Sequence, residues 1–279
     1  MQLLRTIVLG LWSSFDRFLL VTLTLLAAGA SQAAELSSGD STTAAADQLK
    51  ALTDPTIVVP SVWLDTEWDH DEHGAEEVTW TLGGLWARRV SERQDWALRL
   101  KVPIVYDRSD ASSGHANVGG LGDIEVGTGT AFRLSKSWRT GGGIELHADT
   151  ASNPALGDSV WRLHSTWSVA HDLIDWLTLT FTADYNHSIA EENDVAPQRY
   201  LELSLPTTIV LPHDWSISTR YKAKIDFENG DRCTHTADVG VAKRLSSVPV
   251  VFSATLEKTF DGGDEKFQVN FTMTYYFQK

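Results

Sequence analysis

The feature that most constrains this sequence is an alternation of apolar and polar residues, which recurs along the chain after residue 56. In the segment 266–277, aromatic or apolar residues such as Phe267, Phe271 and Tyr275 occupy every second position, and polar residues lie between most of them. Successive side chains of a β-strand point to opposite faces of the sheet, so this pattern predicts strands with one apolar and one polar face. The sequence therefore predicts an all-β fold.

About twelve segments carry this pattern. Most are longer than the ~5–6-residue strands of soluble sheets, and they reach the ~9–11 residues that a tilted strand needs to cross a bilayer. The first and tenth segments alternate poorly, which keeps ten strands as an alternative count. The segments lie near 57–66, 77–89, 95–106, 121–135, 138–149, 159–171, 175–187, 198–211, 214–226, 232–244, 248–260 and 266–277.

Short and long connections alternate between these segments. The longer links are polar, as in 67–76, 107–120 and 150–158. A transmembrane antiparallel up-and-down β-barrel has short periplasmic turns and longer extracellular loops, so we expect this architecture in the bacterial outer membrane, with both chain ends periplasmic. The short turns lie near 92–94, 136–137, 172–174, 212–213 and 245–247.

The N-terminus has the features of a cleavable export signal. Arg5 and Arg17 precede an apolar run at 18–30, which is followed by the small residues Ser31 and Ala33. The run is shorter than the ~20 residues of a spanning helix, so we expect cleavage after Ala33.

Three parts of the chain follow from this prediction. They are a signal peptide at 1–33, a polar periplasmic leader at 34–55 and the barrel at 56–279. A short helix is expected at 42–52 of the leader. Entry of the leader into the barrel is the alternative to a position outside it.

Tryptophans recur at the starts of strands that follow short turns. Indole prefers the membrane–water boundary, so these residues predict a periplasmic aromatic girdle. Trp176 is out of phase with the outward residues of its strand, which leaves the turn as its alternative place. The four girdle residues are Trp96, Trp138, Trp176 and Trp215.

Two soluble folds are alternatives to the membrane barrel. A β-propeller also repeats about every 40–45 residues, but each blade packs four short strands into that length, where this chain has two long ones. A soluble sandwich would have to bury the apolar faces of all the strands in one core.

Composition excludes further classes of function. The chain has a net charge of −14 and therefore lacks the basic surface of a nucleic-acid-binding protein, so no nucleic-acid partner is expected. Cys233 is the single cysteine, which excludes an internal disulfide and a cysteine-based zinc site.

A five-residue motif opens the fourth segment. Gly120, Leu121, Gly122, Asp123 and Ile124 resemble the recurring motif of the proteobacterial outer-membrane family named for the MetA pathway of phenol degradation. The export signal, the hairpin spacing and the aromatic last strand are also similar to that family, and the resemblance extends over 56–277. It implies uptake of aromatic or other hydrophobic compounds.

The partners expected of such a barrel are lipid and lipopolysaccharide, the barrel-assembly machinery and a small-molecule solute. The assembly machinery would bind the C-terminal strand. That strand departs slightly from the usual barrel ending, because its last aromatic residue, Phe277, is followed by Gln278 and Lys279.

With lipid outside, the polar faces of the strands must line the interior. The ninth segment then carries a basic stripe that faces acidic residues of segments four to eight, and Glu202 on segment eight is close enough to neutralise one cation. Charged stripes of this kind set the selectivity of pores; the alternative is that the charges pair and fill a narrow barrel. The pore-lining candidates are Arg99, Lys101, Asp123, Glu125, Glu145, Asp184, Glu202, Arg220, Lys222 and Lys224.

Other chemistry has weak support in the sequence. The link at 67–77 is rich in acidic residues and histidine, but its spacing is that of no specific metal site. His147 and His164 are expected to point inward, and no histidine has the Ser two residues later that barrel lipases use. The chain also lacks a Gly-x-Ser-x-Gly elbow and a phosphate-binding loop. We therefore predict no enzyme, cofactor or metal, with a barrel lipase or protease as the less favoured alternative.

The predicted function is an outer-membrane channel or transporter for small solutes, which the family resemblance implies are hydrophobic or aromatic. The alternative is a structural or adhesive surface barrel with a blocked lumen.

Overall fold

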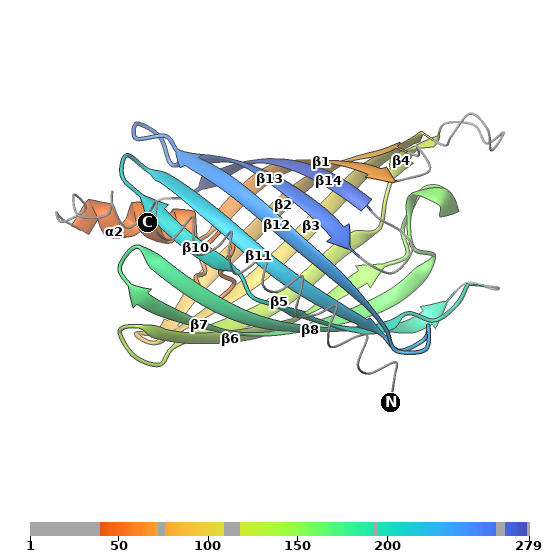
Figure 1. The fold of residues 1–279 in the computed structure, drawn as a ribbon, viewed down its shortest axis with the longest axis horizontal. Helices are drawn as coiled ribbons and strands as arrows, with labels where there is room; N and C mark the ends of the chain where they lie inside the picture. Colours follow the sequence, from red (N-terminus) through yellow and green to blue (C-terminus); the bar gives the residue numbers. More distant parts are fainter. Residues whose placement is uncertain (1–39, 72–75, 109–117, 192–194, 261–265, 278–279) are drawn as a thin grey trace.

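The computed structural model describes residues 40–71, 76–108, 118–191, 195–260 and 266–277, and the predicted signal peptide lies outside them. The described chain forms a closed antiparallel β-barrel with one helix at one end (Figure 1). Its elements are α2 (Asp40–Lys50), β1 (Ser61–Asp71), β2 (Glu76–Ser91), β3 (Gln94–Arg108), β4 (Val118–Leu121), β5 (Ile124–Arg133), β6 (Trp138–Ala148), η2 (Pro154–Leu156), β7 (Val160–Ile174), β8 (Leu177–Glu191), β9 (Arg199–Ser204), β10 (Thr207–Leu211), β11 (Trp215–Asp226), β12 (Arg232–Arg244), β13 (Val250–Phe260) and β14 (Lys266–Tyr276).

Consecutive strands pair with each other except β4 with β5 and β9 with β10, and β14 pairs with β1 to close the barrel. Two of the predicted strands are interrupted rather than continuous. β4 and β5 both pair with β3, and β9 and β10 both pair with β8 and β11. The second interruption contains Pro206, which has no N–H to give to the ladder. Counted with these breaks, the barrel has the predicted twelve strands, and the alternative of ten is wrong.

The outer face of the barrel is apolar. On β2 the exposed residues include Trp80, Leu82 and Trp86, and on β14 they include Phe271 and Tyr275. A soluble protein rarely exposes a contiguous apolar surface of this kind, whereas a closed barrel satisfies its backbone internally and can face lipid. The propeller and sandwich alternatives are therefore wrong. Among the described helices, none is long and apolar enough to cross a membrane.

Three of the four predicted girdle residues face outward near the short turns. Trp96, Trp138 and Trp215 are 42%, 45% and 42% exposed. The assignment of Trp176 to the girdle is wrong: it lies in the β7–β8 turn, is half-buried, and packs against a core cluster that contains Leu49. It points toward the interior because an N-terminal segment lies there.

That segment is the main departure from the expected domain organisation. Helix α2 lies at the same end of the barrel as the short turns (Figure 1), and residues 45 and 48–50 are buried. The alternative position of the leader is therefore the observed one for residues 45–56: they enter the barrel. For the same reason β1 begins at Ser61 instead of 57: Ile57 and Val58 line the cavity, and Val59 packs against a buried cluster that contains Leu49.

Candidate pore lumen

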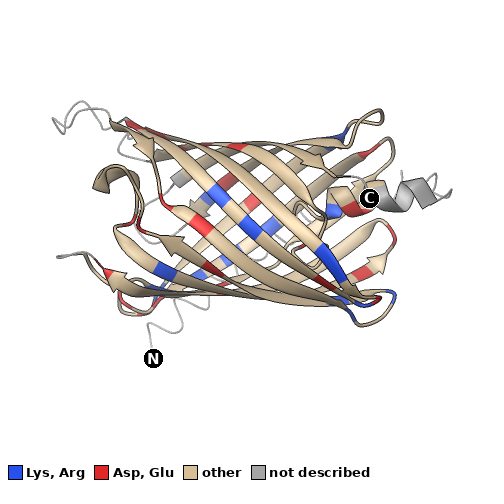
Figure 2. Ribbon diagram, turned by 180° about the vertical axis from the view of Figure 1, so that it is seen from behind, with Lys and Arg blue, Asp and Glu red and all other residues tan. Residues whose placement is uncertain are grey.

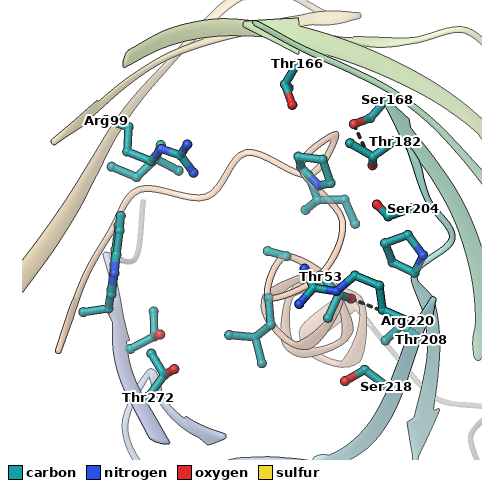
Figure 3. A pocket seen from close by; sticks show the side chains of 18 of the residues that line it. Thr53, Arg99, Thr166, Ser168, Thr182, Ser204, Thr208, Ser218, Arg220 and Thr272 are labelled. Atoms are coloured by element: carbon teal, nitrogen blue, oxygen red, sulfur yellow. Dashed lines mark hydrogen bonds between the residues drawn. The ribbon is translucent and has the colours of Figure 1, made fainter. Parts of the chain in front are cut away.

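The interior wall is built from small and polar side chains that surround a cavity of about 650 Å³. Close approach of strands limits what the wall can carry. A Cβ added to Gly143 on β6 would lie 2.7 Å from the carbonyl oxygen of Thr128 on β5, closer than real side chains come. Serine and threonine hydroxyls continue the wall on the strands that follow, as Ser168 on β7, Thr182 on β8 and Ser218 on β11 show in Figure 3.

A tryptophan side chain lies inside this wall. Trp63 on β1 lines the cavity, while its neighbours Val62 and Leu64 are exposed on the outer face. Gly83 is its register partner on β2, and any Cβ there would overlap the Trp63 indole. Glycine at 83 therefore lets the indole lie against the wall. In this position the indole narrows the lumen less than a ring that projects into it would.

Residues 45–56, which we call the plug, close part of the short-turn end. One side of the plug is apolar. Leu49, 1% exposed, packs in a buried cluster with Val210, Val251 and Tyr276 from three strands. The Tyr276 hydroxyl donates a 2.9 Å hydrogen bond to the backbone carbonyl of Gln48, so the last strand also binds the helix backbone.

The other side of the plug is polar and ion-paired. Lys50 Nζ lies 3.0 Å from Asp172 on β7, and Arg139 on β6 lies 2.9 Å from the fully buried carboxylate of Asp54. Arg139 also pairs with Asp172, which links the two contacts into one network. Asp54 further accepts hydrogen bonds from the backbone N–H and the hydroxyl of Thr56 at 2.9 and 2.6 Å. The plug is thus tied to the wall on opposite sides.

The alternation of apolar and polar residues does not extend to the plug, so it indicates no role for these residues. A signal for them was present: Leu49 and Leu52 are apolar and three residues apart in an otherwise polar leader, as on one face of a helix. A second signal lies in the wall. Val251 and Tyr276 occupy inward positions where the alternation calls for polar residues.

The predicted pore-lining residues fall into two groups. Lys101 and Glu125 pair with each other, and Lys222 and Lys224 lie on β11 beyond the cavity residue Arg220; none of these four lines the cavity. The five that do line it are Arg99, Glu145, Asp184, Glu202 and Arg220.

Asp123 is the clear exception among the pore-lining candidates, and its assignment to the pore is wrong. Its carboxylate accepts hydrogen bonds from the backbone N–H groups of Thr150, Ala151 and Asp158 at 3.0, 3.0 and 2.8 Å. It therefore holds the connection between β6 and β7. Alternation could not reveal this role, because the residue sits in the break between β4 and β5.

The rest of the Gly120–Ile124 motif has the same structural role. A Cβ on Gly122 would lie 2.9 Å from the Val105 side chain and 3.1 Å from the Leu156 carbonyl oxygen. A Cβ on Gly120 would overlap the Ser152 hydroxyl. The motif is thus a compact strand break against which the β6–β7 connection packs.

The basic stripe is neutralised by neighbouring strands. Arg220 Nε lies 2.6 Å from Asp238 on β12, and Lys222 Nζ lies 2.9 Å from Glu257 on β13. Lys224 lies 4.0 Å from the centre of the Tyr200 ring, and its register partner is Glu202. The expected field between this stripe and segments four to eight is therefore wrong for Arg220 and Lys222, which pair with acids on the next strands. Figure 2 shows charges of both signs on adjacent strands of the wall.

The acidic link predicted at 67–77 is mostly strand. β1 extends to Asp71 and β2 begins at Glu76, so only 72–75 connect them, and these lie outside the described residues. Glu67 lines the cavity rather than an external loop. The predicted link is too long because β1 extends beyond the alternating segment. The polar residues at the end of β1 still pair with β14.

A second charged cluster lies on β3, β6, β7 and β8. Arg99 Nη2 lies 2.6 Å from Glu145 Oε2. His164 Nε2 lies 2.9 Å from Asp184 Oδ1. His164 faces the cavity, as alternation predicts.

Comparison with solved structures identifies this architecture. The COG4313 outer membrane channel from Pseudomonas putida F1 is 15% identical, with a TM-score of 0.63 over 79% of this chain and 96% of that chain. The fold is that of a bacterial outer-membrane β-barrel. The CymD monoaromatic hydrocarbon channel aligns with a TM-score of 0.52 at 10% identity, over 83% of this chain and 93% of that chain.

The translocator domain of the autotransporter NalP from Neisseria meningitidis gives a TM-score of 0.53 at 14% identity, over 85% of this chain and 98% of that chain. At these identities the similarity shows the fold of the barrel alone. No protein-family model and no curated protein matches the sequence. Membership of the family that the Gly120–Ile124 motif resembles therefore stays a prediction.

Proposed function

We propose that this barrel is a passive channel for small solutes, with the plug narrowing its periplasmic end. The observation that carries the proposal is the cavity of about 650 Å³, which persists inside the barrel although the plug is docked. Sites for small molecules typically have volumes of ~300–1,000 Å³. A barrel whose role is only structural has no need of such a space.

The path past the plug runs along one side of the lumen. The ion pairs and apolar contacts of the plug are to β6, β7, β10 and β12–β14. On the other side the cavity is lined by Leu85 on β2, Ala97 on β3 and Gly129 on β5. The narrow part of the channel would therefore lie between the plug and these three strands.

Hydrophobic or aromatic compounds are the solute class that we propose. The motif resemblance supports this class, and the CymD channel of the same fold is named for monoaromatic hydrocarbons. The cavity offers a mixed lining, in which Leu52, Trp63 and Leu85 provide apolar contacts among hydroxyl groups. A small aromatic molecule with one polar group fits such a lining better than a sugar does.

Planar-bilayer conductance with a matched pair of variants tests the channel. Ala97→Trp should lower single-channel conductance, since Ala97 lines the cavity and is 8% exposed. Leu98→Trp places the same indole on the outer face and should leave conductance unchanged, because Leu98 is exposed there. If neither the native barrel nor a barrel without the plug conducts or takes up solute, the structural alternative replaces the channel.

A further inference from the structure

Three side chains with metal-binding atoms converge inside the barrel, apart from the plug. Glu145 and His147 are two residues apart on β6, so both face inward, and His164 on β7 is the register partner of Glu145. Strand alternation and cross-strand pairing together place one carboxylate and two imidazoles side by side. One ligand atom from each residue lies within 4.8 Å of the others.

The two distances from the carboxylate oxygen to the imidazole nitrogens are close to the edges of a tetrahedral coordination shell. Glu145 Oε1 lies 3.4 Å from His147 Nε2 and 3.6 Å from His164 Nδ1. An ion bound tetrahedrally at ~2.0–2.1 Å by N and O ligands has neighbouring ligand atoms ~3.3–3.4 Å apart. An octahedral ion such as Mg²⁺ at similar bond lengths needs neighbouring ligands ~3.0 Å apart.

The surrounding residues leave these atoms available. Arg99 binds the other oxygen of Glu145, Oε2, at 2.6 Å. Lys101 Nζ lies 3.7 Å from Oε1, beyond hydrogen-bond distance, so Oε1 can still turn to an ion between the imidazoles. His147 Nε2 is buried and makes no hydrogen bond. A buried polar atom without a partner is costly, and coordination of an ion would satisfy it.

A carboxylate lies near the second ring nitrogen of each imidazole. Asp184 Oδ1 lies 2.9 Å from His164 Nε2, the nitrogen that points away from Glu145. Glu125 Oε1 lies 3.7 Å from the corresponding nitrogen of His147, Nδ1. Such carboxylate–histidine pairs orient metal-binding imidazoles and raise their basicity.

One contact must change when an ion binds. Arg162 lies 2.9 Å from His147 Nδ1, and it must leave for Nδ1 to carry the proton while Nε2 binds metal. Arg162 already has two other acceptors, Asp158 at 2.8 Å and Gln198 at 2.6 Å. Glu125 can then accept the hydrogen bond from Nδ1.

We propose that Glu145, His147 and His164 bind a divalent transition-metal ion inside the barrel, with the fourth coordination position toward the lumen. Two imidazoles and one carboxylate suit Zn²⁺, Cu²⁺ or Ni²⁺, whereas Ca²⁺ and Mg²⁺ prefer oxygen ligands. Glu145 and His164 line the cavity, so an ion can reach the site through the lumen. This inference goes beyond the proposed channel and does not depend on it.

Binding is best measured on the untagged full chain folded in detergent. Titration with Co²⁺ should give visible absorption bands of the high intensity typical of tetrahedral coordination, and calorimetry with Zn²⁺ should give one ion per chain. His147→Ala and His164→Ala should each weaken binding by more than about tenfold, because loss of an outer-shell partner alone costs about 10–100-fold.

His171→Ala is the matched control. His171 also lies on β7, but it stacks on Trp138 at 4.2 Å between ring centroids and contacts Ser137, away from the cluster. Its loss should leave binding unchanged. The more conservative His164→Gln keeps a polar side chain in case the alanine variant fails to fold, and it too should lose the ion. If Zn²⁺ fails to bind, or binds equally well to both cluster variants, the proposal is wrong. The three side chains would then form a salt-bridge network without a metal ion.

Discussion

The two halves of the lumen differ in what their inward-facing side chains contact. At the short-turn end, the wall presents apolar residues such as Val251 and Tyr276, and the plug covers them. Further along, the wall carries charges that pair with one another, as in Arg220–Asp238 and Arg99–Glu145, beside an open cavity. In a membrane barrel, inward apolar residues therefore indicate an occupant of the lumen, whereas inward charge pairs are compatible with water.

Replacing residues 40–56 with a Gly/Ser linker of equal length should have the largest effect, because it removes the plug from the short-turn half of the lumen. The apolar patch around Val251 would then face water, and the ion pairs of Asp54 and Lys50 would be lost. We expect a severalfold increase in single-channel conductance. A barrel that folds, as judged by heat-dependent gel mobility, but conducts no more than the native chain would show that the plug is not the narrow point.

Arg139→Ala should loosen the plug without removing it. The substitution leaves the buried carboxylate of Asp54 without its cation, and breaking a buried pair in this way costs about 3–5 kcal/mol. We expect residues 45–56 to become accessible to protease and the channel to switch between conductance levels. Arg199→Ala is the control, since Arg199 and Glu228 form an exposed pair that contributes little. Equal protease resistance in both variants would contradict the assigned role of Arg139.

Leu49→Ala tests the apolar side of the plug. Truncating a fully buried leucine costs about 2–5 kcal/mol, depending on how far the site can collapse. The same proteolysis assay should show faster cleavage than in the native chain, with the barrel itself intact. Leu205→Ala removes the same group from an exposed position and should leave the rate unaltered.

Lys222→Glu should have the smallest effect. It places a second carboxylate near Glu257, which now pairs with Lys222 at 2.9 Å. Since this local pairing screens the cation from the lumen, we expect a modest shift toward cation selectivity, measured as a change in reversal potential. Arg220 still pairs with Glu257 at 3.4 Å, so the variant should still form the barrel. Unchanged selectivity would mean that the charge pairs of this half serve only the wall.

Much of the barrel was accessible to sequence reasoning because lipid imposes a simple rule on every strand. The alternation at 266–277, for example, follows from one face meeting lipid and the other the lumen. The strand count, the closure of β14 on β1 and the outward positions of Trp96 and Trp215 are confirmed.

What the alternation left open depends on register and on the lumen's contents. It indicates that Arg220 and Asp238 both face inward, but pairing across β11 and β12 decides that they meet. It gives no information on where a strand is interrupted, and for this reason the assignment of Asp123 to the pore lining is wrong. The position of the plug depends on Leu49 and Asp54. The spacing of Leu49 and Leu52 indicates one apolar helix face, but it does not show which surface covers that face.

The plug is joined to the wall by a short covalent tether. Only residues 57–60 separate it from β1, and the carbonyl oxygen of Pro60 accepts a 2.9 Å hydrogen bond from the Phe277 backbone N–H, which fixes the end of the tether to the last strand. Docking is therefore a unimolecular event, and a short flexible linker gives effective concentrations in the millimolar range. Contacts too weak to hold a free peptide can keep a tethered one in place. The tether therefore favours the return of a plug that leaves the lumen wall.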